Sequence, residues 1–156
     1  MDRPNQHIDA SQIKPAALVM QNGSMERLTG KEGQGGSLFL KVTNVVNLYG
    51  ANIELAYDPA LIKVLDDDPT SAGIQFQAAF APRNSYIVTA NADNKQGRLQ
   101  LAFTLTYPTP AISGDALLAS IRYQLKTDQN TASNAFHVVH AQLVDAAGRS
   151  IDTTKY

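Results

Sequence analysis

Residues 48–60 read LYGANIELAYDPA, and this stretch predicts a strand that stops abruptly. Successive side chains of a strand point to opposite faces, so the alternating apolar groups share one face and the remaining groups share the other. The apolar face comprises Ala51, Ile53, Leu55 and Tyr57, and the opposite face comprises Asn52, Glu54 and Ala56. Asp58 then offers an acceptor for backbone N–H groups two or three residues on, and Pro59 has no N–H to give to a sheet. A half-buried strand that ends at Asp58-Pro59 is therefore expected.

The composition fits one globular domain and excludes several classes of function. The chain has 156 residues, of which 44% are hydrophobic and 17% charged. Its net charge is −1, with 13 basic residues scattered among 14 acidic ones, so no basic patch is present for nucleic acid. The absence of cysteine excludes disulfides, thiolate chemistry and zinc–cysteine sites.

The ends of the chain carry little pattern. Residues 1–15 mix Pro, Asn, Gln, Asp and Ser, so we expect a flexible N-terminal arm or linker there. A single domain is predicted over residues 16–152 and a tail over residues 153–156. No secretory signal and no apolar run near the roughly 18 residues needed to cross a bilayer are found. We therefore expect a chain that does not itself span a membrane, either cytosolic or a module of a longer exported protein.

Short apolar segments separated by Gly, Pro, Asn and Asp turns predict an all-β fold, a sandwich or a jelly roll. The segments of strand length are 16–20, 37–45, 48–57, 61–65, 73–80, 84–91, 98–107 and 135–145. Residues 116–126, ALLASIRYQLK, fit a helical stripe and a strand equally well, so periodicity leaves that element open.

The cleanest alternation lies in residues 98–107, RLQLAFTLTY. Its apolar face comprises Leu99, Leu101, Phe103, Leu105 and Tyr107, and its opposite face comprises Gln100, Ala102, Thr104 and Thr106. The apolar set is predicted to point into the core and the other set to point out.

The sequence carries no recognisable catalytic or metal-binding pattern. The sequence contains no nucleophile elbow and no phosphate-binding loop. His137 and His140 are three residues apart, which places them on opposite faces of a strand unless a bulge intervenes. The run Asp66-Asp67-Asp68 could coordinate calcium, but its spacing favours a plain turn. We therefore expect no catalytic residues, no metal site and no cofactor, and an enzyme is the least favoured class.

Several segments in order resemble the cohesin modules. They are LYGANIELAYDPALIKVLD (48–66), the glycine loop before SLFLKVTNV, the strand RLQLAFTLTY and AISGDALLASIRYQLK (111–126), and together they cover most of residues 16–152. The resemblance implies a nine-stranded β-sandwich with jelly-roll topology, which makes 116–126 a strand. It also implies a noncatalytic module that binds a calcium-loaded dockerin domain of another protein through one exposed sheet face. The calcium would belong to the partner.

Carried onto this sequence, the resemblance implies a partner-binding face drawn from three strands. These residues are Asn52, Glu54 and Ala56; Gln100, Ala102, Thr104 and Thr106; and Ser120, Arg122 and Gln124. A flat polar surface of this kind can recognise another protein through a small central contact and hydrogen bonds at its rim.

The leading hypothesis is a protein–protein interaction module of an exported bacterial protein, located outside the cell, at its surface or in the periplasm. One alternative is a carbohydrate-binding module with a polysaccharide partner. Sugar platforms use exposed aromatic rings, and here tryptophan is absent, which leaves Phe39, Tyr49 and Tyr86 as candidates. Another alternative is a structural or assembly domain of an envelope complex, such as a secretin-type secretion protein.

Overall fold

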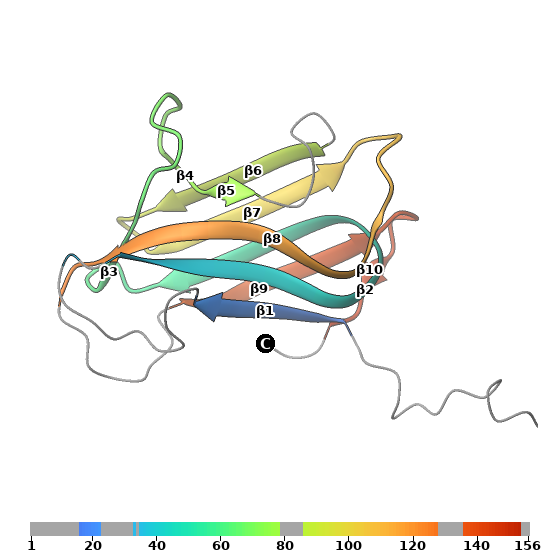
Figure 1. Cartoon of the computed structure of the whole chain (residues 1–156), viewed down its shortest axis with the longest axis horizontal. Helices are drawn as coiled ribbons and strands as arrows, with labels where there is room; N and C mark the ends of the chain where they lie inside the picture. The colour runs from blue at the N-terminus through green and yellow to red at the C-terminus, as the bar shows by residue number, and fades with distance from the viewer. Residues whose placement is uncertain (1–15, 23–32, 34, 79–85, 128–135, 154–156) are drawn as a thin grey trace, which may run out of the picture.

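The computed structural model describes residues 16–22, 33, 35–78, 86–127 and 136–153, and this part of the chain is built of β-strands (Figure 1). The strands are β1 (Ala17–Asn22), β2 (Gly35–Tyr57), β3 (Ile62–Val64), β4 (Ile74–Gln75), β5 (Gln77–Ala78), β6 (Tyr86–Asp93), β7 (Arg98–Leu105), β8 (Ile112–Leu125), β9 (Phe136–Asp145) and β10 (Ser150–Ile151). The described residues contain no helix, so none there could span a membrane. The predicted all-β class is confirmed, and residues 116–125 of the ambiguous segment belong to the strand β8.

The strands form two layers that share β2. The first half of β2 pairs with β1 and β8, and β3 and β5 pair with β8; we call these strands the β8 layer. The second half of β2 pairs with β7 and β9, and the order continues to β10 on one side and to β6 and β4 on the other; this is the β7 layer. Figure 1 shows β2 running beside β1 and β8, bending, and returning between β7 and β9.

The bend lies at residues 44–48, where pairing between β2 and β8 shifts register. Asn44 and Asn47 have φ angles of 56° and 58°, a left-handed conformation that asparagine adopts more easily than most residues. The backbone N–H of Asn44 donates to Asp115 Oδ1 and that of Asn47 to Ser113 Oγ, each at 3.0 Å. The two asparagines therefore let one strand serve both layers without leaving these N–H groups unpaired.

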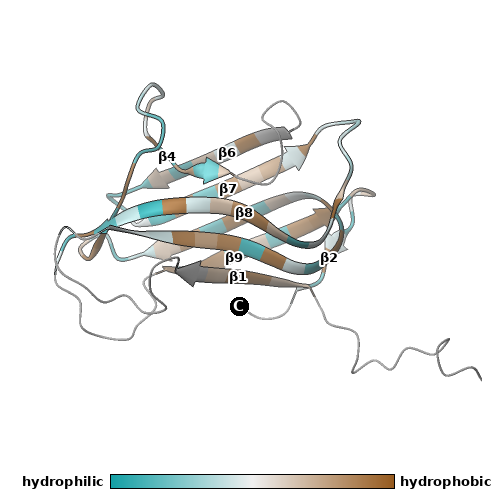
Figure 2. Ribbon diagram, in the orientation of Figure 1, coloured by the Kyte–Doolittle hydropathy of each residue, from teal (hydrophilic) through white to brown (hydrophobic). Residues whose placement is uncertain are grey.

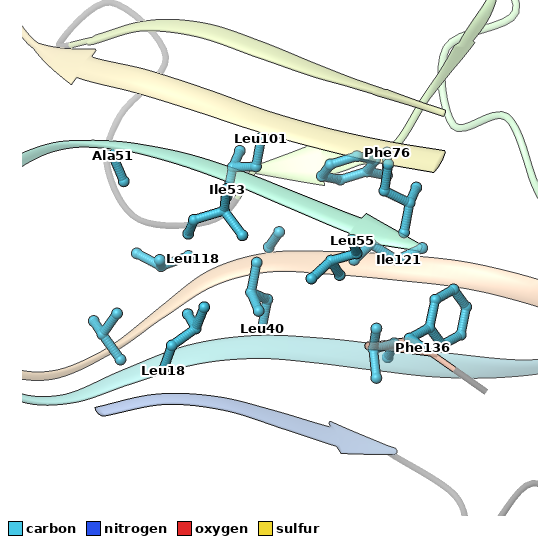
Figure 3. Close-up of a cluster of buried hydrophobic side chains, with 14 of the residues drawn as sticks. Leu18, Leu40, Ala51, Ile53, Leu55, Phe76, Leu101, Leu118, Ile121 and Phe136 are labelled. Carbon is cyan, nitrogen blue, oxygen red and sulfur yellow. The ribbon is translucent and has the colours of Figure 1, made fainter. Parts of the chain in front are cut away.

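The core fills the space between the layers. Figure 3 shows side chains from both halves of β2 pointing toward one another, together with groups from β1, β7 and β8. The labelled buried residues are Leu18, Leu40, Ala51, Ile53, Leu55, Phe76, Leu101, Leu118, Ile121 and Phe136. In the second half of β8, residues 119–125, buried and more exposed positions alternate, as expected for a strand with one buried face, and Figure 2 shows hydrophilic bands in this part of the strand. The predicted inward faces of 51–57 and 99–105 are confirmed.

The end of β7 corrects one prediction. Tyr107 was assigned to the core, but the strand ends at Leu105 and Tyr107 is 92% exposed. The N–H of Thr109 donates to the carbonyl of Thr106 at 2.8 Å, so the chain turns where the alternation continues. Pro108 in this turn has no N–H to extend the ladder. Phe80, the last residue of the predicted strand 73–80, lies outside the described residues.

The Tyr-Asp-Pro sequence closes β2 through the turn between β6 and β7. The N–H of Tyr57 donates to the carbonyl of Gly97 at 2.9 Å, and its hydroxyl donates to Asn94 Oδ1 at 2.5 Å. Asn94 also exchanges two hydrogen bonds with the backbone of Val64, at 2.9 and 3.0 Å. Asp58 Oδ1 accepts the N–H of Ala60 at 2.9 Å, as the sequence predicts. The motif thus joins the end of β2 to β3 and to the β6–β7 turn.

The first and last described residues also meet. Ala16 and Thr153 form an isolated parallel bridge beside β1 and β10. The predicted arm, residues 1–15, lies outside the described residues.

Candidate partner-binding faces

The outer face of the β7 layer presents side chains in rows across four strands. The pairings of β6, β7, β2 and β9 set these rows directly. One row is Asn91, Gln100, Glu54 and His140, and the next is Thr89, Ala102, Asn52 and Gln142. The strands thus bring the predicted residues Asn52, Glu54, Gln100, Ala102 and Thr104 together on one surface.

The centre of this surface is polar and carries small side chains. Gln100 Nε2 donates to Asn52 Oδ1 at 3.5 Å, a diagonal contact between β7 and β2. Glu54 lies between Gln100 and His140 in its row. Among the described residues, no group of three His, Asp or Glu side chains is placed to hold a metal ion. The surface can therefore offer a partner hydrogen bonds and a carboxylate.

Both histidines of β9 lie on this surface, which corrects the expectation that they face opposite ways. The pairing of β2 with β9 shifts between Glu54 and Leu55, so His140 is opposite Glu54 while His137 is opposite Ala56. Val139 is the extra residue of the bulge, and it turns the two histidines to the same side. The three-residue spacing shows that the two histidines can share a face only across a bulge, but it cannot show that the bulge is present.

Ala56 faces outward yet contributes little surface. It is 8% exposed, and its neighbours across the sheet are Arg98 and His137. A methyl group flanked by two longer side chains is covered by them. The prediction that Ala56 is available to a partner on this face is therefore wrong, because its side chain is buried.

Three other predicted residues lie on the opposite side of the molecule. Ser120, Arg122 and Gln124 belong to β8, which pairs with the first half of β2 and with β3 and β5. Arg122 Nε donates to Asp67 Oδ1 at 2.6 Å, and Gln124 Nε2 donates to the carbonyl of Gly33 at 2.9 Å. The predicted single face is thus two faces, because alternation separates inside from outside and does not identify the layer. Thr106, which was also predicted, follows the end of β7.

The aspartate run forms a hydrogen-bonded turn. Asp66 Oδ1 accepts the N–H groups of Asp68 and Gln75 at 3.0 and 3.2 Å. The carboxylate of Asp68 accepts the N–H and the hydroxyl of Thr70 and the hydroxyl of Ser71. Asp67 is paired with Arg122. These contacts support the interpretation of the run as a turn.

The residues whose pKa is shifted do not belong to the rows of the β7-layer surface. Burial, with a smaller effect of the Asp93 charge, raises the pKa of Tyr57 to about 12. Burial also raises the pKa of Tyr123. The N–H of Arg149, ahead of other contacts, lowers the pKa of Asp145 in the β9–β10 turn. Each shift therefore reflects packing or a turn.

Comparisons with solved structures show the same fold at low identity. A type II cohesin A11 from Bacteroides cellulosolvens has 10% identity and a TM-score of 0.68, with 91% of this chain and 96% of that chain covered. A type II cohesin–X–dockerin complex from Acetivibrio cellulolyticus has 13% identity and a TM-score of 0.65, with 89% of this chain and 93% of that chain covered. A non-cellulosomal cohesin from the archaeon Archaeoglobus fulgidus has 14% identity and a TM-score of 0.64, with 90% of this chain and 85% of that chain covered.

The family comparison is more direct. No curated protein matches the chain. The model of the cohesin domain matches residues 24–155, which is most of the chain, and the two-layer β fold agrees with it. The chain belongs to the cohesin family.

Proposed function

We propose that the chain is a noncatalytic module that binds a dockerin-type domain of another protein through the outer face of the β7 layer. The observation that carries the proposal is the set of in-register rows, which places polar side chains of β6, β7, β2 and β9 on one surface. The cohesin in the Acetivibrio complex is bound to a dockerin, and it shares this fold. Calcium would enter with the partner.

The composition of the surface supports a partner that is read by hydrogen bonds. Gln100, Asn52 and Gln142 carry side-chain amides, and Glu54 carries one negative charge. Ala102 lies among them and leaves room for a side chain of the partner. Interfaces of this type combine a small close-packed centre with a polar rim. The proposal further places the module outside the cytoplasm, as part of an exported protein.

A matched pair of substitutions tests the face. Gln100 on β7 and Gln77 on β5 are both exposed glutamines, on the outer faces of opposite layers. The probes are recombinant dockerin modules encoded in the same genome, captured with calcium or with chelator. Gln100→Arg should weaken capture at least tenfold, or about 1.4 kcal/mol, while Gln77→Arg leaves it unchanged. Equal effects of the two changes, or capture that ignores chelator, would contradict the proposal.

A further inference from the structure

The outer face of the β8 layer carries a hollow that the proposed function does not use. It measures about 500 Å³ and lies where β2 begins, beside β8 and the residue after β3. Its lining residues are Gly35, Gly36, Ser37, Phe39, Leu65, Arg122 and Tyr123. This volume is within the usual range of small-ligand sites.

Two adjacent glycines open the hollow for different reasons. A Cβ on Gly36 would lie 2.7 Å from Tyr123 Oη, so that position requires glycine for core packing. A Cβ on Gly35 would meet only the carbonyl oxygen of Tyr123, at 3.6 Å. Gly35 is paired with Gln124, whose side chain is on the outer face. The missing side chain at Gly35 therefore leaves space that packing does not demand.

The polar groups at the hollow retain hydrogen-bonding capacity. Arg122 and Asp67 form an ion pair in which Asp67 Oδ1 takes both contacts of the guanidinium. Asp67 Oδ2 has no donor, and Arg122 Nη1 no acceptor, among the residues that the structure describes. The hydroxyl of Ser37 likewise has no partner there. The lining thus combines the Arg122 guanidinium and the Ser37 hydroxyl with the half-buried ring of Phe39, and Asp67 is held next to it as the partner of Arg122.

This combination selects the chemistry of the ligand. The ion pair gives the hollow no net charge, so neither an anion nor a cation gains from it. A neutral sugar ring has an apolar face of C–H groups for the aromatic ring and a rim of hydroxyls that both donate and accept. We propose that the hollow lined by Gly35, Ser37, Phe39 and Arg122, with Asp67 balancing the charge of Arg122, binds one unit of a neutral glycan, on the layer opposite the dockerin face.

The experiment uses the full chain and soluble hexasaccharides. Cellohexaose, xylohexaose, mannohexaose and chitohexaose are titrated by calorimetry and by ligand-observed NMR, with hexagalacturonate as the anionic comparison. At least one neutral sugar should bind. Phe39→Ala should weaken that binding about tenfold, whereas Phe39→Tyr preserves it.

Gly35→Leu provides the second variant, because it fills the hollow without removing a core contact. It should abolish sugar binding and leave the thermal unfolding midpoint and dockerin capture unchanged. Gln100→Arg should leave sugar binding unchanged, so the failure of one site is distinguishable from failure of the other. Absence of binding at about 10 mM sugar, stronger binding of hexagalacturonate, or binding that survives Gly35→Leu would overturn the proposal. Loss of protein capture in Gly35→Leu would instead assign the hollow to a protein partner.

Discussion

Asn94 accepts the hydroxyl hydrogen of Tyr57 at 2.5 Å while its amide group pairs with the backbone of Val64. One side chain in the β6–β7 turn thus holds the end of β2 and the end of β3. Val64 is buried, so its N–H and carbonyl have no water to replace this partner.

Asn94→Ala should therefore destabilise the fold by about 3 kcal/mol, because it leaves the two backbone groups of Val64 unpaired. Tyr57→Phe removes the contacts of one hydroxyl, to Asn94 Oδ1 and to the carbonyl of Asp93, and leaves the Val64 groups satisfied, so we expect a loss of about 1 kcal/mol. Urea unfolding at 25 °C measures both values. Equal losses would show that Asn94 does not support β3.

The raised pKa of Tyr57 predicts that the folded domain loses stability at alkaline pH. This pKa is raised from 10.0 to about 12, so the neutral hydroxyl contributes stability that is complete below pH 10 and is lost as the pH rises toward 12. Unfolding free energy should fall over this interval less steeply in Tyr57→Phe than in the parent chain. Tyr123, whose pKa is also raised, is present in both and serves as the internal control. Parallel pH profiles would argue against the assignment.

Gly97 and Gly148 form a matched pair for backbone strain. Their φ angles are +72° and +81°, but a Cβ on Gly97 would lie 2.0 Å from the carbonyl oxygen of Tyr57, whereas one on Gly148 would meet nothing within 4 Å. Gly148→Ala should cost about 1 kcal/mol, from the left-handed conformation alone. Gly97→Ala should cost at least about 3 kcal/mol, or prevent folding, because the clash is with backbone. Thermal melts of the two variants compare them.

The bulge at Val139 makes a prediction about the binding surface. It places both His137 and His140 on the outer face of the β7 layer, so His137→Ala and His140→Ala should each alter the affinity for the dockerin probe. We expect changes of about twofold to tenfold, as for contacts away from an interface centre. Gln77→Ala, on the outer face of the opposite layer, is the control. An effect of only one histidine would mean that the bulge does not shape the interface.

The sequence predicted the inside and outside of each strand better than their arrangement. Alternation in residues 51–57 and 99–105 is a local property, because each side chain is buried or exposed according to its own strand. Which layer β8 joins depends on its pairing with the first half of β2, a contact that alternation does not encode. Ser120, Arg122 and Gln124 were assigned to the wrong face for this reason.

Two smaller errors have the same kind of cause. The faces of the two histidines of β9 could be predicted only with knowledge of a bulge, and a bulge is a relation between two strands. Tyr107 continued the alternation of β7 beyond the point where the turn at Thr106 ends the ladder. Pro108 was a visible local signal for that ending.

The parallel bridge between Ala16 and Thr153 sets the direction in which a pull on these two residues would load the domain. At that bridge both segments run in the same direction, so a pull on the two ends draws them past each other lengthwise. The ladder of β1 with β2, six residue pairs long, is then loaded in shear, and its hydrogen bonds must fail together instead of one after another. We therefore expect a domain paired in this way to resist a pull applied at these two residues.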